Sequence, residues 1–293
     1  LESWVVPEHD YPIRFICARP FPRTSAPFAL IWFVIALAIG TLQAALILLR
    51  YRPKVIVGTG GYVSAPILFA YGALAKIGLS RARVLLYEPN AHPGLLNQIA
   101  GRFAHRIGVA FEPAGRWFDM KRVAIVGYPV RRSFLELDRG ASRERLDIAA
   151  ESKVVLAFGG SGGARVINEA VLEALPIWRE AGNILLIHIT GRYKGTEYDA
   201  VADTEAALAR IDLQGEVECY RRYDYADQID DLIAAADLVI CRGGAGTLTE
   251  LGISATPALI VPLPSSTEDH QAINAREMER MGAAQVLYQG VAW

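Results

Sequence analysis

A run of four glycines around one serine, FGGSGGA at residues 158–164, is the turn of this chain best suited to bind an anion. It joins an apolar segment, KVVLAF, to a stretch with helical character. Glycines let the backbone approach a ligand closely, and free amides at a helix start attract negative charge. We therefore expect a diphosphate here, and a tight ligand-free turn is the alternative. The turn is neither G-x-G-x-x-G nor a Walker loop, which disfavours NAD binding and ATP hydrolysis.

A second glycine-rich turn, CRGGAGTLTE at residues 241–250, follows the apolar segment DLVIC. Thr247 can cap a helix that we expect over residues 247–254, which places Glu250 in its first turn. The paired acceptor oxygens of a carboxylate suit the two vicinal hydroxyls of a ribose. The alternative is a carboxylate that only interacts favourably with the helix dipole.

A third turn, LPSSTEDHQAINA at residues 263–275, leads from a predicted strand into a predicted helix. It gathers Asp269, His270, Gln271 and Asn274 at the helix start. Amide side chains both donate and accept hydrogen bonds, as recognition of sugar hydroxyls requires. His270 alone is weak support, because a single histidine is more often a cap or a surface residue.

Three polar turns also lie in the first half of the chain. GTGGYVSAP at residues 58–66 is a further glycine-rich turn, YEPNAHPG at residues 87–94 places Glu88 and Asn90 after a strand, and GYPVRR carries Arg131 and Arg132. A guanidinium group can donate two parallel hydrogen bonds to a diphosphate. Solvated linker charges are the alternative for the two arginines.

These turns require strands and helices that bring them together. Val- and Ile-rich runs alternate with helical stretches, which predicts parallel sheets covered on both faces. We expect strands at residues 54–57, 83–87, 106–110, 123–126, 153–158, 184–190, 216–220, 238–241, 258–261 and 284–288. We expect helices at residues 65–77, 94–104, 164–174, 227–235, 247–254 and 269–281. Ligands bind at the carboxyl ends of parallel strands, where these turns lie.

The predicted class is α/β, with two Rossmann-like domains facing one another. Residues 1–130 form the first domain, residues 131–152 a charged linker with a short surface helix, and residues 153–293 the second domain. A length of 293 residues accommodates both domains. Both ends are expected to be truncated, because the chain begins with Leu1 and stops at Trp293 just after a predicted strand.

Composition restricts the possible partners and compartments. A net charge of −1 argues against an extended nucleic-acid surface. The three cysteines are widely spaced, which predicts neither a metal site nor a disulfide framework and favours a reducing cytoplasm. Residues 28–49 carry no charge and are long enough to cross a bilayer. We expect a membrane-facing interfacial helix, with a spanning helix and a core helix as alternatives.

Six stretches, in this order, resemble the signature stretches of the MurG family of N-acetylglucosaminyltransferases: VGTGGYVSAP, YEPNAHPG, VGYPVR, FGGSGGARVIN, CRGGAGTLTEL and DHQAINA. The resemblance extends from Arg14 to Tyr288 and implies the glycosyltransferase type B fold, with an acceptor domain before a UDP-sugar domain. It also implies inverting transfer of N-acetylglucosamine from UDP-GlcNAc to undecaprenyl-diphospho-N-acetylmuramoyl-pentapeptide. That reaction converts lipid I to lipid II in peptidoglycan synthesis.

The resemblance assigns roles to residues that match the family's stretches. Glu88 and Asn90 would lie at the reacting centre. Glu88 is the best remaining general base if it lies within hydrogen-bond reach of the acceptor hydroxyl, and a structural carboxylate is the alternative. The acceptor diphosphate would face Gly60, Gly61, Tyr62 and Ser64. Glu250 would bind the ribose, and Gln271 and Asn274 the sugar hydroxyls. The full donor-binding set would be Gly160, Ser161, Gly162, Gly163, Arg131, Arg242, Gly244, Thr247, Glu250, His270, Gln271 and Asn274.

The implied scheme needs no metal and no cofactor besides the UDP-GlcNAc co-substrate. The implied partners are the UDP-sugar, the undecaprenyl-linked acceptor and the cytoplasmic face of the bacterial cell membrane, where a peripheral location is expected. Pro89, Gly162 and His270 stand where the family usually has Gln, and the family's opening glycine–histidine loop is not found. The alternatives are a diacylglycerol-type lipid glycosyltransferase, a UDP-GlcNAc 2-epimerase and a non-catalytic UDP-sugar-binding subunit.

Overall fold

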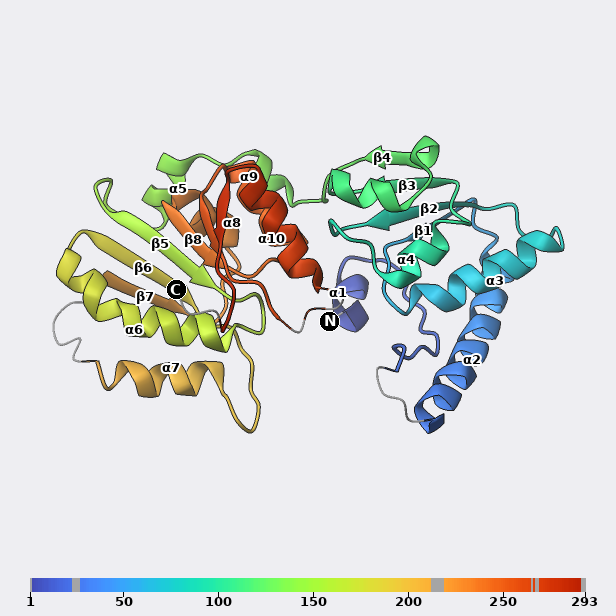
Figure 1. The fold of residues 1–293 in the computed structure, drawn as a ribbon, viewed down its shortest axis with the longest axis horizontal. Helices are drawn as coiled ribbons and strands as arrows, with labels where there is room; N and C mark the ends of the chain where they lie inside the picture. The colour runs from blue at the N-terminus through green and yellow to red at the C-terminus, as the bar shows by residue number, and fades with distance from the viewer. Residues whose placement is uncertain (1, 23–26, 212–218, 265, 267–268, 291–293) are drawn as a thin grey trace. The chain divides into compact units, whose positions relative to one another are not determined.

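The computed structural model describes residues 2–290 except 23–26, 212–218, 265 and 267–268. The chain divides into two compact units (Figure 1). Unit 1 comprises Leu1–Pro89 and Pro93–Gly127, and unit 2 comprises Asn90–His92 and Tyr128–Trp293. Each unit contains one sheet whose strands all pair in parallel, which confirms the predicted α/β class with two Rossmann-like halves.

The sheet of unit 1 has four strands in the order β1-β2-β3-β4. They are β1 (Val55–Gly58), β2 (Arg83–Glu88), β3 (Arg106–Val109) and β4 (Val123–Ile125), all at predicted positions. The helical elements are α1 (Glu2–Glu8), α2 (Pro27–Tyr51), α3 (Ser64–Lys76), α4 (Leu95–Ala100), η1 (Glu112–Trp117) and η2 (Met120–Arg122). Buried Leu68, Leu74, Leu86 and Ile107 belong to the core between helices and sheet.

The prediction that both faces of each sheet are covered is wrong for the edge of unit 1. Ile56 is buried, whereas Val55 and Val57, which point to the opposite face of β1, are more than half exposed. Successive side chains of a strand alternate between faces. Among the described residues, helices therefore cover only one face of this strand.

Helix α2 packs through a single stripe of small residues. Ala36, Gly40, Ala44 and Leu48 recur every four residues and are buried, because positions four apart share one helix face. A Cβ on Gly40 would lie 2.0 Å from the carbonyl oxygen of Cys17, so only glycine allows this approach. The Cys17 amide also donates to Oε1 of Gln43 at 2.7 Å.

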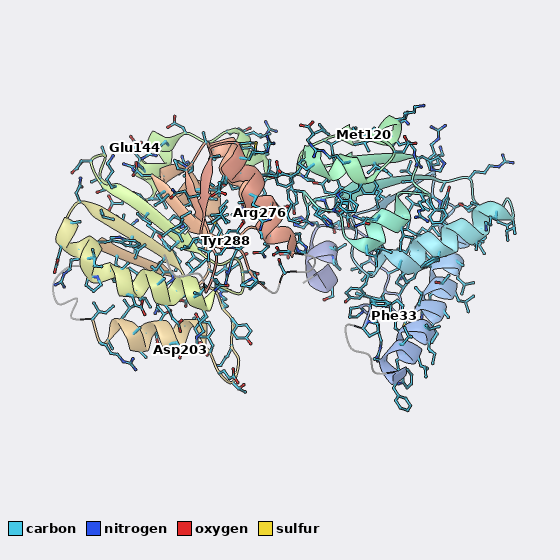
Figure 2. All side chains as sticks on the ribbon, viewed as in Figure 1. Phe33, Met120, Glu144, Asp203, Arg276 and Tyr288 are labelled. Atoms are coloured by element: carbon cyan, nitrogen blue, oxygen red, sulfur yellow. The ribbon has the colours of Figure 1, made fainter. Side chains whose placement is uncertain are left out.

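The other faces of α2, on which Phe33 is labelled in Figure 2, are apolar, and most of their large side chains are exposed. Leu42 and Leu46 are 65% and 61% exposed. By length and composition alone the segment Phe28–Tyr51 could cross a membrane, and only 17% of its most apolar window is buried. Cores of soluble proteins bury such helices, so this one presents an unusually large apolar surface.

The sheet of unit 2 has six strands in the order β10-β9-β8-β5-β6-β7. They are β5 (Lys153–Phe158), β6 (Ile184–Ile189), β7 (Tyr220–Tyr223), β8 (Leu238–Cys241), β9 (Ala258–Ile260) and β10 (Ala284–Val286). The chain adds strands outward from β5 to β7, then returns to β8 on the other side of β5. The carboxyl ends of β5 and β8 therefore flank a topological switch point, where open α/β sheets bind ligands.

The helices of unit 2 are η3 (Arg132–Leu135), α5 (Arg139–Arg145), α6 (Arg165–Ala181), α7 (Ala200–Leu208), α8 (Ile229–Ala235), α9 (Ala245–Ser254) and α10 (His270–Arg280). Helix α7 was not predicted, and β7 begins where the predicted strand at residues 216–220 ends. Most of that prediction lies outside the described residues. Thr247 was expected to cap α9, but the helix begins at Ala245 with Gly244 at the N-cap, so Glu250 lies in its second turn.

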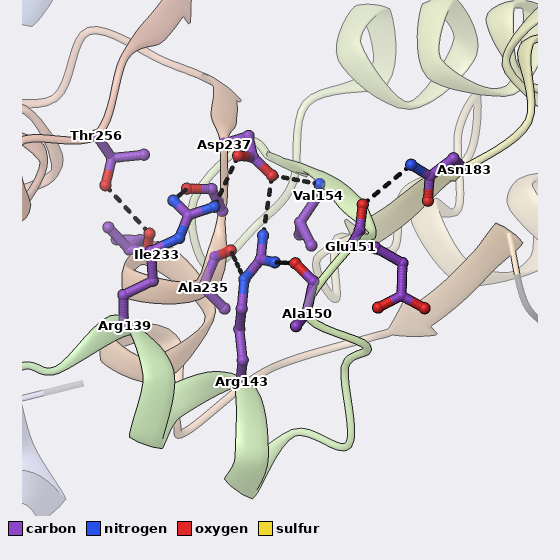
Figure 3. A network of polar contacts seen from close by, with 11 residues as sticks. Arg139, Arg143, Ala150, Glu151, Val154, Asn183, Ile233, Ala235, Asp237 and Thr256 are labelled. Carbon is purple, nitrogen blue, oxygen red and sulfur yellow. Dashed lines mark hydrogen bonds and ion pairs between the residues drawn. The ribbon is translucent and has the colours of Figure 1, made fainter.

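Residues 131–152, expected to link the domains, fold as η3 and α5 on the surface of unit 2. Nη2 of Arg143 donates to Asp237 at 2.9 Å and its Nε to the Ala235 carbonyl at 3.1 Å (Figure 3). Asp237 also accepts from Arg139 at 2.7 Å and from the Val154 amide at 2.8 Å. Because one carboxylate joins α5 to the starts of β5 and β8, this segment is fastened to unit 2.

Candidate functional site

The glycine turn after β5 has the backbone arrangement of an anion-binding loop. Gly160, Ser161 and Gly162 are exposed, and Gly160 and Gly163 have φ of +89° and +80°. The carbonyls of Ser161 and Gly162 accept from the amides of Arg192 and Tyr193 at 3.3 and 3.2 Å. Within the described chain no backbone carbonyl accepts from the amides of Ser161 and Gly162. These donors are therefore available to a ligand.

A loop after β6, residues 190–193, supports the glycine turn, and the sequence analysis did not identify it. A Cβ on Gly163 would lie 2.0 Å from the Thr190 carbonyl oxygen, and one on Gly191 would lie 2.1 Å from the Gly163 amide nitrogen. Both glycines are therefore required by the contact between the two loops. The signal in the sequence was Gly191, which directly follows the strand predicted at residues 184–190.

Across the switch point, α9 carries Glu250. Its side chain is half-buried, and burial raises the pKa of its carboxyl group. The positive charge of Arg131 opposes this rise and the carboxylate of Asp230 adds to it. In the described part of the chain no donor is hydrogen-bonded to this carboxylate. A partly desolvated carboxylate with both oxygens available suits a diol better than a solvated surface carboxylate does.

The two arginines assigned to the donor differ in their surroundings. Arg131 is exposed, stacks on Phe134 at 5.4 Å and donates to the Asp227 carbonyl at 3.4 Å, which leaves most of its donors to solvent or a ligand. Arg242 is half-buried, and burial lowers its pKa. Its Nη1 contacts the carbonyls of Val261 and Pro262 and Oε1 of Gln289, so it ties the β8 turn to later segments.

The start of α10 lies against the β8 turn. A Cβ on Gly243 would lie 2.3 Å from the Gln271 carbonyl oxygen. Asn274 is fully buried; its Nδ2 donates to the Gly243 carbonyl at 3.3 Å and to Oδ1 of Asn90 at 3.1 Å, while its Oδ1 accepts from the Ala91 amide at 2.8 Å. Asn274 thus holds the segment Asn90–His92 within unit 2. Oε1 of Gln271 accepts from the Leu263 amide at 3.0 Å.

In unit 1 Glu88 lies beneath the glycine turn that follows β1. It is 1% exposed, and its Oε2 accepts from Nδ2 of Asn97 at 2.7 Å. A Cβ on Gly60 would lie 2.9 Å from the same nitrogen. Asn97, on α4, was not singled out in the sequence. In this arrangement Glu88 orients Asn97 and supports the turn, and its own oxygens face the protein.

The remaining residues of that turn differ in accessibility. Gly61 and Tyr62 are exposed, and Gly61 has a φ of +76°. Ser64 is the first residue of α3, and its hydroxyl donates to the Gly60 carbonyl at 2.7 Å. The turn is thus closed on itself and presents its backbone outward.

In unit 2 the donor-assigned residues lie at the turn after β5, at the turn after β8 and on α9, and at the start of α10, while Arg131 is the residue before η3. Thr247 lies in the first turn of α9, and His270 is the first residue of α10. Among the described residues, no group of three or more His, Cys, Asp or Glu side chains is arranged to hold a metal ion. Within the described residues, amides that no backbone carbonyl accepts from follow β5, and a carboxylate that accepts no hydrogen bond lies on the helix after β8. Such groups suit a ligand that carries both a diphosphate and a diol.

Two family models match the chain. The glycosyltransferase family 28 N-terminal domain matches residues 1–109, and the glycosyltransferase family 28 C-terminal domain matches residues 154–292. Together they match most of each unit, and residues 110–153 lie between the two matches.

Relatives support the same assignment. The enzymes named UDP-N-acetylglucosamine–N-acetylmuramyl-(pentapeptide) pyrophosphoryl-undecaprenol N-acetylglucosamine transferase of Desulforudis audaxviator and Acetivibrio thermocellus are 36% and 35% identical. Each alignment covers 98% of this chain, and 74% and 73% of the relative. In fold, the crystal structure of Acinetobacter baumannii MurG matches 100% of this chain and 75% of its own, with a TM-score of 0.69 at 24% identity. The chain therefore belongs to the MurG family of family 28 glycosyltransferases.

Proposed function

We propose that this chain transfers N-acetylglucosamine from UDP-GlcNAc to undecaprenyl-diphospho-N-acetylmuramoyl-pentapeptide, with inversion at the anomeric carbon. The observation that carries the proposal is that complementary groups follow β5 and β8, the two strands that flank the switch point of unit 2. These groups are the exposed amides of Ser161 and Gly162 and the half-buried carboxylate of Glu250, which accepts no hydrogen bond in the described part of the chain. Family membership and the names of relatives that cover nearly the whole chain support the choice of donor and acceptor.

The donor binds across the carboxyl ends of β5 and β8. The diphosphate lies on the amides of Ser161 and Gly162, and Glu250 accepts hydrogen bonds from the two ribose hydroxyls. Gln271 and His270 reach the sugar, while Asn274 positions the Gly243 backbone from beneath. Thr247, Gly244 and Arg242 shape the turn that contacts the nucleotide.

In the transfer step the muramoyl hydroxyl attacks the anomeric carbon, the bond from that carbon to the β-phosphate oxygen breaks, and the hydroxyl proton passes to a general base, for which Glu88 is the candidate. The leaving UDP gains charge, which the loop amides and the guanidinium of Arg131 stabilise. The scheme uses no metal ion. Preorganised donors of this kind are aimed at charge that develops in the transition state, so they lower the barrier more than they strengthen ground-state binding.

The acceptor diphosphate binds the exposed backbone at Gly61 and Tyr62. Because Glu88 is buried beneath Asn97, we propose that it acts in this conformation by holding Asn97 and the Gly60 turn. To act as general base, it must come within hydrogen-bond reach of the acceptor hydroxyl. Asn90 lies next to the sugar-binding residues through its contact with Asn274.

The apolar surface of α2 supports a peripheral location on the cytoplasmic face of the cell membrane, where the lipid-linked acceptor is embedded. Leu42 and Leu46 project from it into solvent in the absence of lipid. Insertion of such side chains among acyl chains is favoured by about 25 cal/mol per Å² of apolar surface.

The deciding experiment incubates the purified chain with labelled UDP-GlcNAc and either lipid I or diacylglycerol in mixed micelles. We expect a β-linked GlcNAc product from lipid I alone, and equal rates with and without EDTA. Transfer to diacylglycerol indicates the other lipid glycosyltransferase, and free UDP-ManNAc indicates an epimerase. UDP binding without any product indicates a non-catalytic subunit.

A further inference from the structure

The glycine turn of unit 2 is held by a line of buried polar side chains to which neither the sequence nor the comparisons assign a role. Asn168 on α6, His188 on β6 and Tyr220 on β7 are each at most 9% exposed. Nδ1 of His188 lies 3.0 Å from the Tyr220 hydroxyl, and its Nε2 lies 3.1 Å from Oδ1 of Asn168. Nδ2 of Asn168 donates to the Thr190 carbonyl at 2.9 Å.

The protons in this line have one consistent arrangement. A carbonyl oxygen can only accept, so the amide nitrogen of Asn168 must point at Thr190 and its oxygen at His188. Nε2 of His188 must then carry the proton, and Nδ1 accepts from the Tyr220 hydroxyl. Burial, assisted by the charge of Arg222, lowers the pKa of His188 to about 4 and so keeps the ring neutral. The same Asn168 nitrogen also donates to the Tyr198 hydroxyl at 2.7 Å.

The hydrogen bonds of Asn168, His188 and Tyr220 lead to the Thr190 carbonyl oxygen, which contacts the glycine turn. The Thr190 carbonyl is what a Cβ on Gly163 would strike at 2.0 Å. Arg192 and Tyr193, two and three residues after Thr190, donate their amides to the carbonyls of Ser161 and Gly162. In an anion-binding turn the carbonyls must point away from the anion. Here the amides of Arg192 and Tyr193 hold the carbonyls of Ser161 and Gly162 in that orientation.

We propose that Asn168, oriented by His188 and Tyr220, is a positioning residue for donor binding: it fixes the Thr190 loop, which holds the glycine turn with its amides outward. The inference rests on the proposed function, because it concerns binding of the UDP diphosphate at that turn. Asn168 acts through the backbone, since it is 2% exposed and contacts no ligand itself.

The test measures UDP affinity by calorimetry and KM for UDP-GlcNAc and for lipid I, on the whole chain. Asn168→Ala is expected to weaken UDP binding about tenfold, the effect of one well-placed hydrogen bond. KM for UDP-GlcNAc should rise by a similar factor while KM for lipid I stays unchanged. Leu175→Ala is the matched control, because Leu175 is fully buried on the same helix and lies away from the turn. It should lower thermal stability without changing UDP affinity.

A second pair of variants decides the matter if Asn168→Ala does not fold. His188→Gln retains an amide donor for Asn168 and should bind UDP within twofold of the wild type, whereas His188→Leu should bind it about fivefold more weakly. The inference is wrong if His188→Gln and His188→Leu bind UDP with equal affinity, or if Asn168→Ala binds it as tightly as the wild type. In either case the proposed function is unaffected, provided that the wild type binds UDP. A folded wild-type chain that binds no UDP overturns the proposed function and the inference together.

Discussion

Replacement of Glu250 by alanine is the most direct perturbation of the proposed donor site. The carboxylate is half-buried, and in the described part of the chain it lacks a hydrogen-bonding donor. The protein therefore already carries part of its desolvation cost before a ligand arrives. A ribose that supplies two hydroxyl donors recovers that cost, so the interaction should contribute more than a hydrogen bond on the surface.

The expected magnitude follows from the two hydrogen bonds. A hydrogen bond to a charged group contributes about 1.5–3 kcal/mol when it is buried. Because Glu250 is half-exposed, solvent screening reduces each bond to about 1–1.5 kcal/mol, which gives about 2–3 kcal/mol for both bonds together. The dissociation constant of UDP should then rise about 30- to 150-fold.

The assay is isothermal titration with UDP and with its 2′,3′-dideoxy analogue. Wild type and Glu250→Ala should differ strongly for UDP and hardly at all for the analogue, because the analogue lacks the hydroxyls. Glu250→Gln keeps one acceptor oxygen and should fall between them. Equal losses of affinity for both ligands would show that Glu250 acts on something other than the ribose, and the assignment would be wrong.

Replacement of Glu250 should weaken UDP binding but should not lower the stability of the folded chain. Because burial raises the pKa of Glu250 above its unfolded value, folding disfavours the charged form. The stabilising contribution of this group is present below the unfolded pKa and is lost as pH rises through the folded pKa. At neutral pH, urea unfolding of Glu250→Gln should therefore give a free energy equal to or above that of the wild type. A clear destabilisation would contradict a role confined to ligand binding.

Three further predictions concern other parts of the chain. Gly163→Ala should lower the free energy of unfolding by about 3 kcal/mol or more, because the new Cβ would clash with a backbone oxygen and the residue has a positive φ. Gly162→Ala, which has open space around it, should change the free energy of unfolding by less than about 1 kcal/mol. Urea unfolding of both variants checks this. Because the pKa of His188 is lowered on folding, the unfolded chain binds a proton at higher pH than the folded chain does. The free energy of unfolding should therefore fall as pH drops from 6.5 toward 4, by up to about 1.4 kcal/mol per pH unit. If His188→Gln shows the same dependence on pH, His188 is not its cause. Replacing Leu42 and Leu46 together by Gln should reduce co-sedimentation with anionic vesicles and leave the melting temperature unchanged, because both side chains are exposed; unchanged sedimentation would place the membrane contact elsewhere.

The sequence by itself determined the local elements and their class. An apolar run such as KVVLAF, followed directly by a glycine turn, predicts a buried parallel strand that leads into a helix. For this reason the predicted strands at residues 153–158 and 238–241 match β5 and β8. The family stretches were also visible as spacing along the chain, and they led to the correct family.

Local signals were insufficient where a tertiary contact sets the outcome. The start of α9 at Ala245 differs from the prediction: Gly243 packs against the Gln271 backbone, and the N-cap is Gly244, three residues before Thr247. Residues 131–152 have the composition of a linker, yet Asp237 on another part of the chain fastens them to unit 2. A composition signal contains no information about such a partner.

The roles of the buried polar residues were decided only by the tertiary structure. Glu88 at the end of a strand has the sequence pattern of an accessible base, but Asn97 and Gly60 cover it. Asn168, His188 and Tyr220 are scattered over more than fifty residues of sequence and form one line because β6 pairs with β7 and α6 covers β6. Strand pairing and burial turn isolated polar side chains into oriented hydrogen-bond partners, and that geometry depends on distances between segments that no local pattern encodes.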